Sequence, residues 1–298
     1  MDHKQFLASL SPEQCRELTQ TSDARGLAQL AAHLGAILLL GGLIAARVPF
    51  WPVLMLPQGI LLVFLFTLLH EASHATPFRS RWLNAAAAHL SGFAILLPPR
   101  WFRYFHFAHH RFTHLPGKDP ELDAPKPETW GQYLVHVSGI PVWISHVRTL
   151  VRNAAGRCAD AYVPAAKRGA VRTEAQVMLG IYLALILGSL ALATPVLLFV
   201  WLIPLALGQP FLRLYLLAEH GRCPHVANML ENSRTTLTNA LVRRLAWNMP
   251  YHAEHHSYPM VPFHRLPDLH RLTAEHLKVT EKGYARFHAK YAPEMGRE

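Results

Sequence analysis

The amino-acid sequence predicts an all-α integral membrane protein with four transmembrane helices in two hairpins and a cytoplasmic helical cap that holds a metal site. Three observations support this prediction. The chain of 298 residues is 51% hydrophobic and only 16% charged, whereas soluble domains carry about 25% charged residues. Four apolar segments are long enough to span a bilayer, which takes about 20 residues each. Histidines gather in three short clusters beside those segments.

The four apolar segments form two pairs. They cover approximately residues 27–46, 51–69, 177–193 and 196–218. Only the four residues Arg-Val-Pro-Phe separate the first two segments, and Pro195 interrupts the second two. Because the connections are so short, we expect each pair to be a helical hairpin. A fifth apolar stretch, residues 83–97, is too short to span and is expected at the membrane interface.

Basic residues are distributed unevenly along the chain. The hairpin tips carry only Arg47, whereas residues 100–172 and the chain after Glu219 are densely basic. The positive-inside rule then places both termini and the metal site in the cytoplasm, at the inner membrane if the source is a bacterium. The net charge of +10 therefore indicates an anionic lipid surface rather than nucleic acid as the partner. No linker or repeat divides the sequence, so residues 1–298 are expected to form one domain.

Eight of the 20 histidines fall into three clusters with H-x-x-x-H or H-x-x-H-H spacing. They are His70 and His74, then His106, His109 and His110, and finally His252, His255 and His256. On a helix, residues i, i+3 and i+4 lie on one face, so the members of a cluster can reach one metal ion or two adjacent ions. Neutral imidazole suits iron, zinc, copper and nickel. Eight ligands suit two ions of about four nitrogens each, with positions left open for dioxygen.

The clusters, their order, the two-hairpin layout and the stretch N-M-P-Y-H-A-E-H-H-S-Y-P resemble the membrane fatty acid desaturase and hydroxylase superfamily. The resemblance covers most of residues 27–275. It implies that the eight clustered histidines bind two iron ions that activate dioxygen. It also implies a ninth ligand at the cytoplasmic end of the fourth apolar segment, where His220 stands in A-E-H-G.

Polar residues beside the clusters are candidates to orient the ligand histidines, because a ligating imidazole usually hydrogen-bonds through its second nitrogen. The candidates are Glu71, Glu219, Glu254, Asp119 with the nearby Glu121, and Asn248. Solvated surface, a turn or a helix cap are the competing interpretations.

Two polar residues lie within the apolar segments. Arg213 is costly there and stands seven residues before His220. It is expected to pair with a cluster carboxylate or a substrate head group, or else to extend to the interface. His33 has no partner spacing and is expected to make a helix-packing hydrogen bond.

The resemblance implies dioxygen-dependent oxidation of a fatty-acyl chain, from an acyl lipid or a fatty acid, with desaturation as the first expectation. Hydroxylation of a fatty acid or alkane, decarboxylation to a terminal alkene, and carotenoid oxygenation stay open. The sequence shows no ferredoxin-type cysteine pattern, flavin fingerprint or cytochrome motif. Electrons are therefore expected from a separate donor, such as a ferredoxin with its reductase, attracted by the basic face.

Two other classes of protein compete with this interpretation. His70-Glu71-x-x-His74 is also the zinc metalloprotease signature, with Glu71 as the base, but a protease leaves six clustered histidines unexplained. A metal transporter usually binds its ion near the membrane midplane. Among the histidines only His33 is expected to lie so deep.

Overall fold

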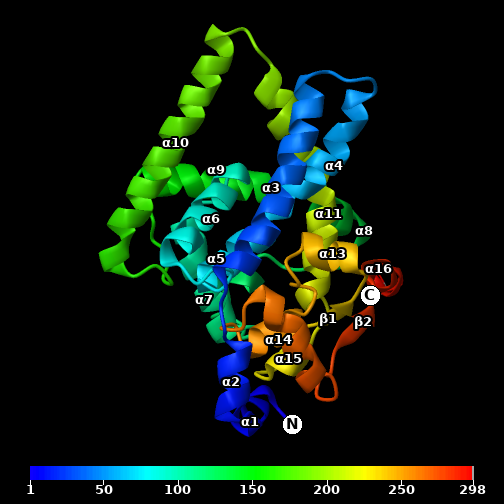
Figure 1. Ribbon diagram of the computed structural model, residues 1–298. Coiled ribbons are helices and arrows are strands. Elements are labelled where there is room, and N and C mark those ends of the chain that lie inside the picture. The colour runs from blue at the N-terminus through cyan, green and yellow to red at the C-terminus, as the bar shows by residue number, and fades with distance from the viewer. Residues whose placement is uncertain (297–298) are drawn as a thin grey trace.

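The structure, a computed structural model, describes residues 1–296 and is mostly helical (Figure 1). The helices of ten or more residues are α3 (Asp23–Ala45), α4 (Trp51–Val63), α5 (Leu65–His74), α6 (Arg81–Ala94), α7 (Pro99–Phe112), α9 (Ile140–Ala154), α10 (Arg168–Ala191) and α11 (Ile203–His220). The shorter helices are α1 (His3–Ser9), α2 (Pro12–Leu18), α8 (Trp130–Ser138), α12 (Met229–Asn232), α13 (Ala240–Leu245), α14 (His252–Ser257), α15 (Leu266–Thr273) and α16 (Tyr284–Tyr291). Single turns η1 (Pro120–Asp123), η2 (Ala165–Lys167), η3 (Leu198–Leu202), η4 (Phe263–Arg265) and η5 (Ala292–Glu294), and strands β1 (Thr235–Leu237) and β2 (Thr280–Lys282), complete the fold.

Within residues 1–296, four helical segments are long and apolar enough to cross a membrane, which confirms the predicted number. They are Pro12–Ala45, Trp51–His74, Ala165–Ala191 and Leu198–His220. The third begins well before the apolar stretch that starts at residue 177, because polar residues such as those at the start of α10 continue a helix as well as apolar ones do. The fifth stretch, α6, is 14 residues long and is not among the four.

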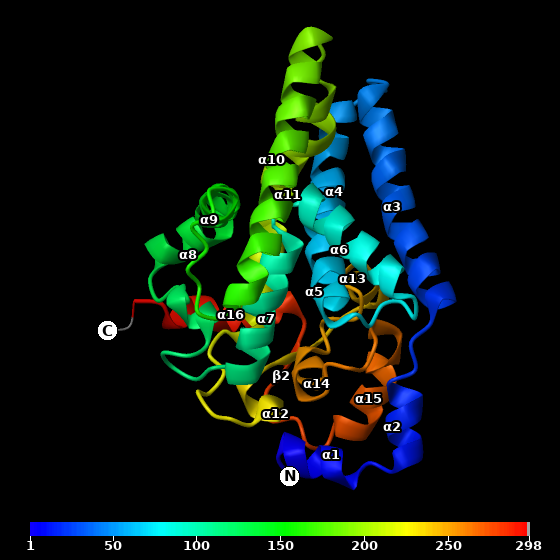
Figure 2. The same cartoon turned by 90° about the vertical axis from the view of Figure 1, so that its left-hand side faces the viewer.

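The long helices project toward one end of the molecule, and the short helices and both termini gather in the other half (Figures 1 and 2). Helices α4 and α11 form the most extensive pair, and α3 packs along α4. Helix α10 packs against α9 and leans away from α11 (Figure 1). The second pair of candidate spans is therefore open over most of its length, unlike the compact hairpin expected from the short connection.

Helices α4 and α11 touch backbone to backbone. A Cβ atom at Gly59 would lie 1.9 Å from the Pro204 carbonyl oxygen, and one at Gly208 would lie 2.2 Å from the Gly59 carbonyl carbon. Small residues at such a crossing allow close helix packing in a membrane. Because α4 leads into α5 and both α5 and α11 end in histidines, this contact sets the spacing of the histidines below it.

The buried His33 connects α3 to the rest of the fold. Its Nε2 lies 2.9 Å from the Leu61 carbonyl oxygen, and its Nδ1 accepts a hydrogen bond of 3.2 Å from Trp247 Nε1. This residue, His33, therefore makes the predicted packing hydrogen bonds, one to α4 and one to the segment just before α14.

The short strands anchor α14. Strand β1 pairs in parallel with β2, and Thr235 also forms an antiparallel bridge to Tyr251, the residue before α14. The whole of α14 is buried. Two chain segments far apart in sequence thus hold a six-residue helix that would not be stable alone.

Helices α8 and α9 expose an apolar surface within the region that the sequence marked only as basic. Seven large side chains are exposed there: Trp130, Leu134, Val135, Ile140, Ile144, Val147 and Val151. The four on α9 follow helical spacing, so they form one outward face.

We expect Gly59→Ala to destabilise the protein by about 1–3 kcal/mol, because the added methyl forces α4 away from α11. The thermal midpoint in detergent should fall, and bound metal should fall with it. Gly180→Ala on α10 is the matched control, since its Cβ would meet no atom within 4 Å. Equal stability of the two variants would contradict the close crossing.

Candidate metal centre

Four helices bring histidines to one buried region. The last turn of α5 carries two, the middle and end of α7 carry three, α11 ends in one, and α14 carries three. Helix α7 begins with Pro99 at its first position, where a missing N–H costs nothing. Helix α5 stops at Ala75, whose φ of 60° ends the helical path directly after His74. All nine histidines predicted as ligands lie in this region.

Five of these histidines form a first group. They are His70, His74, His106, His110 and His255, and each offers a nitrogen within 4.8 Å of the others. The Nε2 atoms of His74 and His106 are 2.8 Å apart. His74 and His110 are partly exposed, and the other three are buried.

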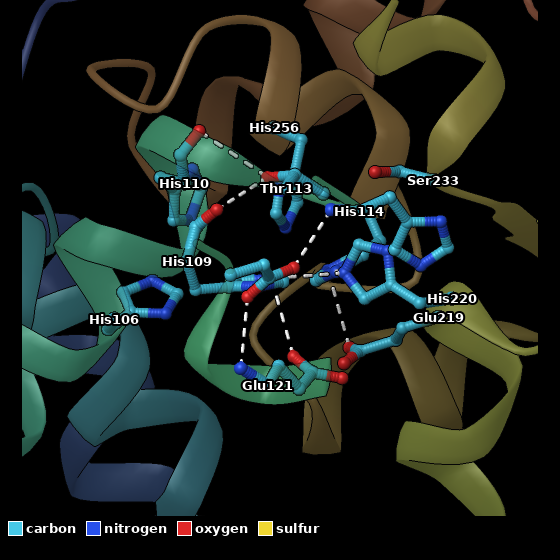
Figure 3. A network of polar contacts seen from close by, with 12 residues as sticks. His106, His109, His110, Thr113, His114, Glu121, Glu219, His220, Ser233 and His256 are labelled. Atoms are coloured by element: carbon cyan, nitrogen blue, oxygen red, sulfur yellow. Dashed lines mark hydrogen bonds and ion pairs between the residues drawn. The ribbon is translucent and has the colours of Figure 1, made fainter. Parts of the chain in front are cut away.

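Three buried histidines, His109, His220 and His256, form a second group with the same spacing limit (Figure 3). His252 adjoins it, since its Nε2 lies 2.9 Å from that of His220. The ring centroids of His110 and His256 are 4.1 Å apart and the rings stack, so the two groups are in direct contact at this point. We call them the five-histidine group and the second group, and count His252 with the latter.

Each of the two clusters with three histidines is divided between the groups. The spacing of the histidines alone did not predict this division. His106 and His110 lie in the five-histidine group and His109 in the second group. In α14, His255 joins the former while His252 and His256 face the latter. Residues i and i+4 differ by about 40° around a helix, whereas i+3 lies about 60° to the other side of i. Each helix therefore presents histidines to two adjacent positions.

Three of the nine rings have a hydrogen-bond partner for Nδ1, and a carboxylate faces the Nδ1 of two more without a hydrogen bond. The distances are 2.9 Å from His109 to Asp119 Oδ1, 3.1 Å from His220 to the Asn232 carbonyl, 3.2 Å from His256 to the Thr113 hydroxyl, 3.4 Å from His252 to Glu219 and 3.9 Å from His255 to Glu71. Such partners orient a ligating imidazole and select its tautomer. In each of these five rings, Nε2 then points toward one of the two histidine groups.

The nitrogens that face the groups fit metal ions. Both ring nitrogens of His70, His110 and His255, and Nε2 of His256, are buried without a hydrogen-bond partner in residues 1–296. Buried polar atoms rarely stay unpaired in proteins. Two imidazoles bound side by side to one ion at about 2.1 Å have nitrogens about 3 Å apart, as the close Nε2 pairs have here.

Electrostatics favours the neutral, metal-binding form of most rings. Burial, followed by the neighbouring histidines, lowers the pKa of His106, His110, His255 and His256 well below the usual value. His109 differs: burial opposes its protonation, but Glu121 and Asp119 outweigh burial and raise its pKa. The Glu121 carboxylate also lies 3.4 Å from His109 Nε2, so it faces the second group itself.

Two predicted orienting residues make other contacts, and Arg213 does not pair with a cluster carboxylate. The buried Glu254 carboxylate binds the Thr235 hydroxyl and His270. The Asn248 amide donates to the Phe263 carbonyl at 2.9 Å. Within residues 1–296, no carboxylate lies within 4.0 Å of the Arg213 guanidinium. Glu254 and Asn248 thus connect α14 to its surroundings and do not face the histidine groups.

Sequence reasoning missed three residues that hold the site. Thr113 donates to the His109 carbonyl at 2.7 Å and so accepts from His256. Arg234, 7% exposed, donates to the Ala218 and Gly221 carbonyls at the end of α11. Asn232 acts through its backbone oxygen, so no side-chain pattern could reveal it. For Thr113, the signal was its position four residues after His109.

Comparison with known proteins gives a family match and two partial relatives. A family profile described as Fatty acid desaturase matches residues 25–290. The chain is 30% identical over 104 residues to an sn-1 acyl-lipid omega-3 desaturase (ferredoxin) of Nostoc sp. (strain 36), which covers 32% of this chain and 29% of that protein. It is 30% identical over 92 residues to a fatty acid conjugase of Calendula officinalis, which covers 31% of this chain and 24% of that protein. The matched part thus spans less than a third of either relative.

We expect Asp119→Asn to weaken metal binding by about 10–100-fold, because the charge that orients His109 is lost. Metal content after dialysis against graded chelator measures the effect. Asp123→Asn, an exposed acid on the same turn, is the matched control. If both variants retained metal like the unchanged protein, Asp119 would have no role in holding it.

Proposed function

This chain belongs to the fatty acid desaturase family, and on that basis we propose that it desaturates a fatty-acyl chain with dioxygen at a centre of two iron ions. Membership of the family makes it an oxidoreductase. The observation that carries the di-iron proposal is the division of nine histidines into two adjoining groups. One ion alone would use about half of the nitrogens present.

The proposed ligands follow the two groups. His70, His74, His106, His110 and His255 would hold one ion, and His109, His220, His252 and His256 the other. Iron bound there supplies the electron transfer that reduces dioxygen. Removing two hydrogens from adjacent carbons yields two electrons, and reducing dioxygen to two waters takes four. Two further electrons must therefore come from a donor.

The chain's own residues keep the imidazoles neutral, oriented and shielded from water. Asp119, Glu219 and Glu71 face the outer nitrogens of three rings, and Thr113 and the Asn232 carbonyl face two more. Burial removes competing water from most of these nitrogens. Partial exposure of His74 and His110 leaves the five-histidine group as the side closest to solvent.

We also propose that the single domain crosses the membrane four times, with the termini and the metal centre in the cytoplasm. The distribution of basic residues supports this orientation. Both termini lie in the same half of the molecule as α14, away from the tips of the long helices (Figure 2), which agrees with it.

The substrate and donor classes are proposed with the help of the relatives. One is named an acyl-lipid desaturase with ferredoxin and the other a fatty acid conjugase, and both names refer to acyl chains. A separate acidic donor such as a ferredoxin, with its reductase, would be attracted to the basic face of this chain. Hydroxylation, decarboxylation to a terminal alkene and carotenoid oxygenation are the alternative outcomes of the same centre.

The surroundings of Glu71 argue against the zinc metalloprotease alternative. Its carboxylate is fully buried, accepts from the Thr76 hydroxyl at 2.9 Å and from the Phe263 N–H at 3.2 Å, and faces His255. A protease base needs contact with a metal-bound water. Glu71 instead supports a histidine of the third cluster.

Expression in a host without desaturases tests the reaction. We expect new double bonds in the acyl chains and about two irons per purified chain. His220→Ala or His255→Ala should abolish the new double bonds, while His225→Ala, an exposed histidine, should not. Acyl chains and carotenoids analysed by mass spectrometry give the answer. Terminal alkenes, or oxidised carotenoid beside unchanged acyl chains, would replace desaturation with another outcome.

Reporter fusions at each terminus test the orientation. We expect a cytoplasmic reporter, such as green fluorescent protein, to be active at both ends, because four spans return the chain to its starting side. A periplasmic reporter fused at residue 193 between the third and fourth spans should be active. Activity of a periplasmic reporter at either terminus would overturn the proposed orientation.

A further inference from the structure

Helix α11 carries two polar side chains, one turn apart, on the side that meets helices α8 and α9. The first, Gln209, is 1% exposed. A Cβ atom at Gly139, in the turn between α8 and α9, would lie 2.2 Å from its Cγ, so the side chain packs directly against that turn. Its Oε1 is buried without a hydrogen-bond partner in residues 1–296, and rotation of the amide by 180° about its last bond presents the NH2 donors at that place instead.

The second, Arg213, lacks a partner as well. Its Nε is buried without a hydrogen bond in the described chain. Glu121 and Glu219 act on it electrostatically but lie beyond the 4.0 Å of an ion pair. The side chain is partly exposed, but a buried donor without a hydrogen bond is costly, so Nε should have a partner. This donor suits an anion that the described chain does not supply.

Two histidines complete the surroundings of Arg213. Burial and then the Arg213 charge lower the pKa of both His136, on α8, and His146, on α9, to about 4. Both rings are therefore neutral at physiological pH and add no second cation. The Nε2 of His136 is also buried without a partner in the described chain. Arg213 is thus the cation closest to these unpaired atoms, and it can bind an anionic group through its guanidinium.

The position of Arg213 relates this cluster of polar side chains to the metal centre. Arg213 and His220 are seven residues apart on α11, so they lie on nearly the same face, about 10 Å apart along the axis. A ligand whose anionic end binds Arg213 therefore has to extend by about 10 Å before its chain reaches the second histidine group. The exposed apolar face of α9, which includes Ile144 and Val147, borders the same region and suits a ligand that arrives from lipid.

We propose that Arg213, assisted by Gln209, binds the carboxylate of a free fatty acid and so sets the carbon that meets the metal centre. The inference rests on the proposed function and names the head group of its substrate. A guanidinium pairs with a carboxylate through two parallel hydrogen bonds. A phosphate monoester offers the same oxygens but carries up to two charges, and the nearby Glu121 and Glu219 disfavour the second charge. The oxidised position is then counted from the carboxyl end.

Binding to the purified protein tests the site without turnover. The probes are dodecanoate, dodecyl phosphate and methyl dodecanoate. Arg213→Gln should weaken dodecanoate binding about tenfold or more, the loss expected for a charged hydrogen-bonded pair. It should leave methyl dodecanoate unchanged. Arg213→Lys should retain part of the affinity, and Arg148→Gln, an exposed cation on α9, all of it.

Metal content and elution profile like those of the unchanged protein show that each variant is folded. Gln209→Leu, which removes the amide and keeps the size, gives a second and smaller loss for dodecanoate. Equal losses for acid and ester, unchanged dodecanoate binding in Arg213→Gln, or tight binding of dodecyl phosphate in place of dodecanoate would each overturn the proposal.

Product position gives an independent measurement. With acids of 12, 14 and 16 carbons as substrates, the oxidised carbon should keep a constant distance from the carboxyl carbon. A constant distance from the methyl end would contradict the site. Protein that binds dodecanoate through Arg213 but holds no iron would reject the proposed function and leave this inference standing.

Discussion

Burying nine imidazole rings side by side is tolerable only if both nitrogens of each ring have a partner. Protein groups meet this requirement mainly at the Nδ1 side of the rings. Carboxylates, a hydroxyl and a carbonyl face Nδ1 of five rings, and the opposite nitrogens converge within a few ångströms of one another. The convergent nitrogens cannot pair with one another by hydrogen bonds, since two neutral acceptors repel. Metal ions bound between these nitrogens would satisfy them all at once.

The same constraint explains why residues distant from the histidines matter for the site. Asp119 is on the turn after α7, Asn232 ends α12, and Arg234 binds the carbonyls at the end of α11. Each must be in place before the ring that it supports is oriented. The close contact of Gly59 with α11 controls the spacing of α5 and α11 in turn. The lower half therefore assembles as one cooperative unit with the central helices.

In the function that we propose, chemistry and substrate recognition are located in different parts of this fold. The histidines occupy α5, α7, α14 and the end of α11. Arg213 and Gln209 lie earlier on α11, against α8 and α9. A metal centre tolerates little change in geometry, whereas a head-group pocket on separate helices can vary without disturbing it.

The sequence by itself determined the features that depend on neighbours along the chain. Hydropathy set the number of candidate spans, and helical spacing identified the clustered histidines, because both follow from residues within a few turns. Packing decided the rest: which histidine of each triplet joins which group, that α10 leans away from α11, and that Glu254 binds His270. His220 and Asn232 are partners only because α12 folds back to the end of α11. Contacts through backbone atoms, and between residues more than 100 positions apart such as Thr113 and His256, leave no periodic pattern, so only the tertiary structure could reveal them.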